Sequence, residues 1–201
     1  MHAVEENEAG PEVAALYLEF RAQFGRPSIP GVLKCFATHP PLLQHMMAIS
    51  ESLLFCDGRL TRRHKEMIAT FVSSLNSCAY CADSHGYFLR MQGGSAEALL
   101  AIKQCDLTSS SLTTAEKALL AFVQKVTQDS VAVKRTDIDQ LICTGWTEPQ
   151  LAEATHIIAL FAAFNRVANT FGLPSQQLLD LLETSPSTDA ARSTADPRST
   201  S

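Results

Sequence analysis

Residues Asn76-Ser-Cys-Ala-Tyr-Cys-Ala-Asp-Ser-His85 hold two cysteines three positions apart and a histidine four positions further on. Neither Pro nor Gly interrupts the stretch, and Ser77 is a residue type favoured at helix N-caps. In a helix that begins there, the side chains of Cys78, Cys81 and His85 project from one face. The stretch therefore predicts a helix whose start carries a reaction surface or a metal site.

The predicted place of Cys78 and Cys81 in a first helical turn has a chemical consequence. Unpaired backbone N–H groups and the helix dipole at that end favour a thiolate, so the pKa of such a cysteine falls below its free value of about 8.5. His85, one turn beyond Cys81, can accept and return the thiol proton or, when charged, lower that pKa further.

Three uses of these side chains compete. Two buried thiols with a hydrogen-bonded core histidine are the plainest interpretation. The second is a zinc site, because Cys78, Cys81 and His85 supply three ligands and His64 or Glu66 could supply the fourth. The third is thiol redox chemistry, in which one cysteine attacks and its neighbour resolves the product into an intramolecular disulfide. The three-residue spacing at a helix start suits that closure and favours the third interpretation.

The rest of the chain predicts an all-α fold in a single helical domain, residues 1–183. Apolar residues recur at spacings of three and four positions, as in a helix, and no strand pattern is present. We expect about eight or nine helices, followed by a disordered tail over residues 184–201, where no apolar residue is larger than Ala. The helices are expected at 11–24, 42–55, 61–75, 78 to the glycines at 93 and 94, 95–104, 113–126, 137–143, 147–171 and 174–182.

The helix before the motif is expected to bring a carboxylate to the histidine. Thr61 is a favoured N-cap type, and only two or three residues separate the end of this helix, near Leu75, from the motif helix. Such a short connection predicts an antiparallel hairpin. Counting back along both helices places Glu66 within reach of His85.

Composition excludes some classes of function. The net charge is -5 and the pI is near 5.6, which argues against nucleic acid as the main partner. The longest apolar run, Ile157–Phe164, is too short to span a membrane, and the acidic first residues are unlike a signal peptide. We therefore expect a cytoplasmic protein with no membrane partner.

The remaining conspicuous residues have ordinary explanations. His64 is expected in a solvated basic helix start with Arg62, Arg63 and Lys65, and His156 as a satisfied core histidine. Asn165-Arg166 is expected to pair with a carboxylate across an oligomer interface. The cysteines outside the motif stand singly in apolar surroundings and are expected to be reduced, buried and inert; they are Cys35, Cys56, Cys105 and Cys143.

The motif and its flanks resemble a known family. Glu66, Cys78, Cys81 and His85 stand as E-x11-C-x2-C-x3-H. This pattern resembles the signature of alkylhydroperoxidase D-type proteins in the carboxymuconolactone decarboxylase superfamily. The likeness covers about residues 10–182, and the flanks resemble the peroxidase-related branch of that superfamily; they are 39–43, 60–69, 114–122 and 164–172.

The resemblance implies an all-helical protomer in a homo-oligomer, often trimeric or hexameric. We expect no metal or other cofactor. It implies that Cys81 attacks an organic hydroperoxide and becomes a sulfenic acid, with which Cys78 condenses. A thiol or a lipoylated protein then reduces the disulfide. Glu66 and His85 act as a proton relay, and Tyr80 is an auxiliary hydrogen-bond donor or an oligomer contact.

A rival class of function uses the same Cys and His residues. It is a non-catalytic interaction module, in which the dithiol senses oxidation or holds zinc without turnover. The intact set of Glu66, Cys78, Cys81 and His85 favours the enzyme, because relatives that decarboxylate lactones generally lack it.

Overall fold

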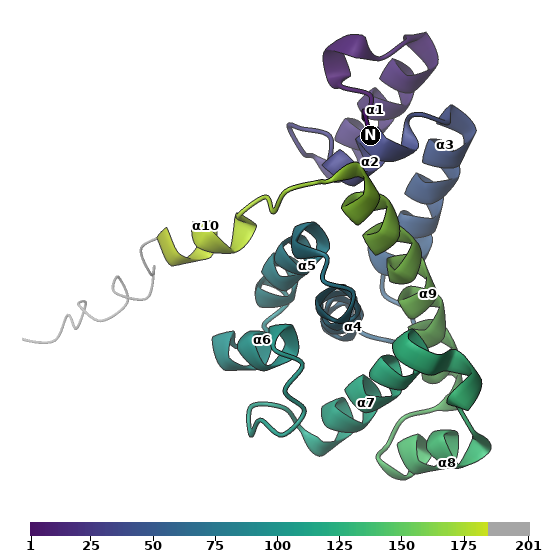
Figure 1. Ribbon diagram of the computed structural model, residues 1–201, viewed down its shortest axis with the longest axis vertical. Coiled ribbons are helices and arrows are strands. Elements are labelled where there is room, and N and C mark those ends of the chain that lie inside the picture. Colours follow the sequence, from purple (N-terminus) through teal and green to yellow (C-terminus); the bar gives the residue numbers. More distant parts are fainter. Residues whose placement is uncertain (185–201) are drawn as a thin grey trace, which may run out of the picture.

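The computed structural model describes residues 1–184 of the 201. Within that part the chain forms ten α-helices and no strand, which confirms the all-α prediction (Figure 1). The number exceeds the expected eight or nine because a short helix near the N-terminus was not predicted. The disordered tail predicted from residue 184 onward lies outside the described residues, apart from Thr184 at the end of the last helix.

The N-terminal third packs three helices beside the rest of the fold. The 3-10 helix η1 (Glu6–Glu8) precedes α1 (Pro11–Phe24), α2 (Gly31–Phe36) and α3 (Pro40–Ile49), which continues as the π-helix η2 (Ser50–Leu54). Gly25 ends α1 in a left-handed conformation, with a φ of 61°. The six residues of α2 are too few to show a helical period, which explains why the sequence did not predict this helix.

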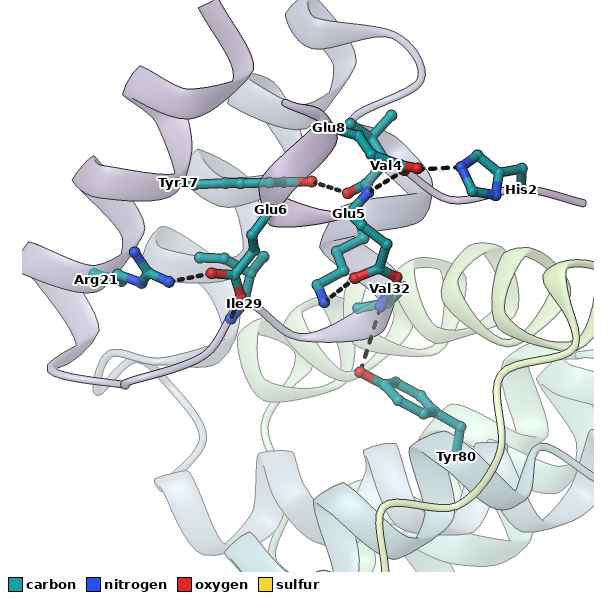
Figure 2. A network of polar contacts seen from close by, with 11 residues as sticks. His2, Val4, Glu5, Glu6, Glu8, Tyr17, Arg21, Ile29, Val32 and Tyr80 are labelled. Carbon is teal, nitrogen blue, oxygen red and sulfur yellow. Dashed lines mark hydrogen bonds and ion pairs between the residues drawn. The ribbon is translucent and has the colours of Figure 1, made fainter. Parts of the chain in front are cut away.

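The polar contacts of the first residues join η1 to the helices around it (Figure 2). The hydroxyl of Tyr17 on α1 donates to the carbonyl of Val4 at 2.8 Å. Glu6 pairs with Arg21 of α1 and accepts a hydrogen bond from the backbone N–H of Ile29 at 3.1 Å. The Glu6 side chain of η1 therefore anchors the segment between α1 and α2.

Helices α4 (Arg62–Leu75) and α5 (Ala79–Met91) form the predicted antiparallel hairpin. In Figure 1, α4 lies at the centre of the molecule, with other helices around it. Every residue from Lys65 to Ser73 is buried, so α4 is covered on all sides rather than along one stripe. The Thr61 hydroxyl accepts from the backbone N–H of His64, which confirms Thr61 as the cap.

The C-terminal half wraps around this hairpin. It consists of α6 (Ala96–Lys103), α7 (Thr114–Asp129), the 3-10 helix η3 (Ser130–Ala132), α8 (Arg135–Cys143), α9 (Glu148–Phe171) and α10 (Leu178–Thr184). Helix α9 has 24 residues and is long and apolar enough to cross a membrane. Half of its most apolar part is buried inside the protein, as in the core helix of a globular fold, so it is weak evidence for a membrane span.

The sequence predicted that the basic start of α4 is solvated, and the structure contradicts this. Lys65 is fully buried; its Nζ lies 2.7 Å from Oε1 of Glu153 on α9 and donates to the carbonyls of Leu53 and Cys56. Arg63 pairs with Glu116 on α7. The sequence could not show these partners, because each lies on a distant element.

Two further sequence predictions need correction. His156 is exposed on α9, not a core residue. The four single cysteines are free as expected, but only Cys35 is buried, whereas Cys56 and Cys105 are partly exposed and Cys143 is exposed.

Candidate functional site

The motif residues lie at the turn of the central hairpin and along α5. Cys78, not Ser77, is the N-cap of α5, and Cys81 lies in the first turn. Ser77 adopts a left-handed conformation with a φ of 51°, and the backbone N–H of Cys78 donates to the carbonyl of Ser73 at 2.8 Å. Ser77 therefore belongs to the turn between the helices, and the N-cap of α5 lies one residue later than the sequence predicted.

The predicted meeting of Glu66 and His85 is confirmed. Nδ1 of His85 lies 2.6 Å from Oε2 of Glu66, across the hairpin. Glu66 is fully buried, and its other carboxylate oxygen pairs with the guanidinium of Arg62, one turn earlier on α4. A carboxylate at Nδ1 holds the proton on that nitrogen and leaves Nε2 as the basic one.

Aromatic rings fix the imidazole plane. The ring of His85 meets the edge of Phe161 on α9 at 4.5 Å between centroids, and that of Phe88 at 5.8 Å. Arg62 lies 4.9 Å over the ring of Phe55 and donates to the carbonyl of Leu54. The row from Arg62 through Glu66 to His85 is thus packed on both sides, which limits the rotation of the histidine.

Both motif thiols are buried and interact with each other. Cys78 is 1% exposed and Cys81 is 3% exposed. A hydrogen bond from the Cys81 thiol lowers the pKa of Cys78 to about 7, with smaller help from the backbone N–H of Cys81 and the side chain of Asn165. The same hydrogen bond, together with burial, raises the pKa of Cys81. When the pair loses one proton, Cys78 is therefore the thiol that ionises, and Cys81 keeps its proton and donates it in the hydrogen bond.

A pH titration checks this charge distribution. We expect the ultraviolet absorbance of the reduced protein to show a step of about one thiolate per protomer near pH 7, with the anion forming as pH rises. The step should be absent from Cys78→Ser. In Asn165→Ala its midpoint should rise, because the amide donor is lost. A wild-type protein with no thiolate step below about pH 8.5, the free-cysteine value, would contradict the lowered pKa of Cys78.

Asn165 is a site residue that the sequence did not predict in this role. It is buried on α9, where its amide donates to the Ser73 hydroxyl at 3.0 Å and its oxygen accepts from Asn76 at 3.0 Å. These contacts tie α9 to the hairpin beside the thiols. Arg166 is exposed and donates to a carbonyl of its own helix, and its expected pairing across an oligomer stays a prediction.

A cavity of about 450 Å³ opens in front of Cys81 and His85. Its wall is mostly apolar and comes from the N-terminal helices, α5, α9 and the segment that contains α10. The Asp83 carboxylate of α5 accepts from the backbone N–H groups of Leu178 and Leu179, which holds α10 beside α5 (Figure 1). Leu178 of α10 lines one side of the cavity. The aromatic lining residues are Phe20, Phe24, Phe55, Tyr80, Tyr87, Phe88 and Phe164.

Tyr80 joins the cavity wall and is buried within the protomer, which does not fit a role as an oligomer contact. Its hydroxyl oxygen accepts from the backbone N–H of Val32 on α2 at 3.3 Å (Figure 2). Burial raises the pKa of the phenol to about 12, so it stays protonated and can still donate.

The arrangement of side chains does not favour zinc. Among residues 1–184, no group of three or more His, Cys, Asp and Glu side chains has a geometry that could hold a metal ion. Of the two predicted fourth ligands, His64 bonds to Thr61 and meets the edge of Trp146, and Glu66 is occupied by Arg62 and His85.

Comparison with known proteins places this site in a family. Residues 40–125, which carry all four motif residues, match the model of the carboxymuconolactone decarboxylase family. This segment belongs to the carboxymuconolactone decarboxylase family. The fold around it is alkylhydroperoxidase D-like, as the sequence resemblance implied.

Solved structures of similar fold span most of this chain. An uncharacterized peroxidase-related protein with an alkylhydroperoxidase AhpD core, from Ralstonia eutropha JMP134, is 26% identical over 89% of this chain and 96% of its own, with a TM-score of 0.75. One from Silicibacter sp. TM1040 is 24% identical over 83% and 85%, with a TM-score of 0.73. The debrominase Bmp8 is 18% identical over 90% and 94%, with a TM-score of 0.71. No curated protein matches the chain.

Proposed function

We propose that the protein is a thiol-dependent peroxidase that reduces organic hydroperoxides through Cys78 and Cys81. The observation that carries the proposal is that Cys81 and His85 line the same apolar cavity, while Glu66, itself paired with Arg62, holds Nδ1 of the imidazole. A hydroperoxide in the cavity meets a sulfur and a general acid together. Cys78 does not line the cavity, which suits the resolving role.

The first step breaks the peroxide O–O bond. The thiol proton of Cys81 passes to Nε2 of His85, so that Cys81 becomes the thiolate and His85 the imidazolium. Its sulfur attacks one peroxide oxygen and is oxidised to a sulfenic acid, while the other oxygen leaves as an alkoxide. Protonated His85 gives its proton to that alkoxide, and the product is an alcohol.

The second step closes the dithiol. Cys78, which the local hydrogen bonds favour as a thiolate near pH 7, attacks the sulfenic sulfur of Cys81. The S–O bond breaks, and the departing hydroxide takes up a proton from solvent and leaves as water. The sum is one hydroperoxide and two thiols converted to an alcohol, water and one disulfide. An external thiol, such as the dithiol of a lipoylated protein, supplies two electrons to restore the pair. Assembly as a trimer or hexamer and a cytoplasmic location remain predictions alongside this cycle.

The test is a count of free thiols in the reduced protein before and after one equivalent of cumene hydroperoxide. We expect two thiols to be lost per protomer, one equivalent of alcohol to form, and mass-spectrometric mapping to find a Cys78–Cys81 disulfide. Thiols that stay unchanged at that pair would refute the peroxidase. The four other cysteines serve as the internal control, because their count should not fall.

The number of peroxide equivalents consumed per protomer distinguishes the enzyme from the rival function, a redox-sensing module. A sensor loses the same two thiols once and consumes one equivalent of peroxide. With excess dihydrolipoamide and excess peroxide, the enzyme should instead consume many equivalents per protomer. Consumption that stops at one equivalent under those conditions would favour the sensor.

A further inference from the structure

Arg26 is a cation at the cavity whose role the proposed cycle does not explain. It lies in the segment between α1 and α2 and lines the cavity that contains Cys81 and His85. Its guanidinium lies 5.7 Å from the centre of the Phe88 ring. No carboxylate among residues 1–184 forms an ion pair with it.

The charge of Arg26 is not balanced within the cavity. No Asp or Glu is among the described residues that line it. Arg62 also reaches the wall, but Glu66 already neutralises that guanidinium. The cavity therefore combines an aromatic, largely apolar interior with one guanidinium that no carboxylate of residues 1–184 pairs with. A charged group beside apolar walls pairs strongly with a ligand of opposite charge.

The segment that carries Arg26 is fixed on both sides. Gly25 ends α1 in a left-handed conformation immediately before it, and the backbone N–H of Ile29 donates to Glu6 just after it (Figure 2). The same Glu6 carboxylate pairs with Arg21 of α1. Because the backbone is anchored on both sides, binding of an anion by Arg26 need not order this segment of the chain.

We propose that Arg26 binds the carboxylate of the substrate, so that the preferred substrate is an organic hydroperoxide with an apolar body and an anionic end. The inference rests on the proposed function and deepens it. The aromatic walls take the apolar body, Arg26 takes the carboxylate, and the hydroperoxide end reaches Cys81. Arg26 is a binding residue for substrate and takes no part in proton transfer.

A binding experiment tests this subsite without requiring turnover. The probes are 4-phenylbutanoate and its neutral amide, titrated calorimetrically into the reduced full chain. We expect the carboxylate to bind about tenfold more tightly than the amide, the scale of one charge-assisted hydrogen bond. In Arg26→Gln the preference should disappear through loss of carboxylate affinity, with the amide affinity unchanged.

Arg59→Gln is the matched control, because Arg59 is exposed and lies outside this cavity, yet its loss changes the net charge equally. It should keep the tenfold preference. Equal affinity of the two probes in the wild type, no binding of either, or a preference that survives in Arg26→Gln would each overturn the subsite.

A kinetic arm separates failure of the subsite from failure of the peroxidase. The substrates are linoleic acid hydroperoxide and its methyl ester. Arg26→Gln should raise KM for the acid about tenfold, with kcat for the acid and both kinetic constants for the ester unchanged. Absence of all peroxide turnover, with the binding preference intact, would refute the enzyme but keep the anion subsite. Normal turnover with equal KM values in the wild type would refute the subsite alone.

Discussion

Replacing Cys81 with serine is expected to lower peroxide consumption by at least about a thousandfold. A serine hydroxyl is hardly ionised at neutral pH and cannot form a sulfenic acid, so the chemical step is lost rather than slowed. The cavity and the Glu66–His85 pair do not depend on the sulfur, so folding should be retained. The rate is measured as hydroperoxide loss with excess dihydrolipoamide, and the fold by circular dichroism.

Cys78→Ser is the matched variant, because it removes a thiol of equal size one turn away. It should react once, consume about one equivalent of peroxide and stop, leaving a sulfenic acid at Cys81 that dimedone labels. The reverse pattern, with Cys78→Ser inert and Cys81→Ser reacting once, would show that the roles are exchanged. The lowered pKa of Cys78 makes this a meaningful alternative, whereas the cavity-facing position of Cys81 favours Cys81 as the attacking thiol.

Replacing Glu66 with glutamine is expected to lower kcat by about 10²- to 10⁴-fold, the usual worth of a general acid-base group. The neutral amide cannot stabilise the charged imidazole, and it can present its N–H₂ to Nδ1, which favours the wrong tautomer of His85. Arg62, which is partly buried, also loses its counter-charge. Breaking a buried ion pair costs about 3–5 kcal/mol, so a fall in the free energy of unfolding should accompany the kinetic loss.

Glu116→Gln separates the two effects. Glu116 is also buried and also paired with an arginine of α4, Arg63, but it does not line the cavity. It should lower stability, measured by urea unfolding, and leave kcat near that of the wild type at a temperature where both are folded. If the two variants lost activity in proportion to stability, the relay role of Glu66 would be excluded and its role would be structural.

The sequence by itself determined the helices and the central hairpin. Helix periods and caps depend on residues a few positions apart, so the cap at Thr61 could be predicted locally. The short connection after Leu75 fixed the register of α4 against α5. For this reason the contact between Glu66 and His85 followed from counting alone, although the two residues are 19 positions apart.

The tertiary structure decided which polar side chains of α4 and α9 belong to the site. Arg62, Arg63 and Lys65 look alike in sequence, yet one holds Glu66 and the others pair with α7 and α9. Asn165 approaches the thiols only because α9 crosses the hairpin.

The cavity is likewise a product of the assembled fold, because its wall joins the N-terminal helices to α5, α9 and the segment around α10. Arg26 meets Phe88 there, 62 positions away along the chain (88 − 26). Local patterns specify which elements form. The partners of a buried charge depend on how elements distant in sequence pack, and no short-range pattern encodes that arrangement.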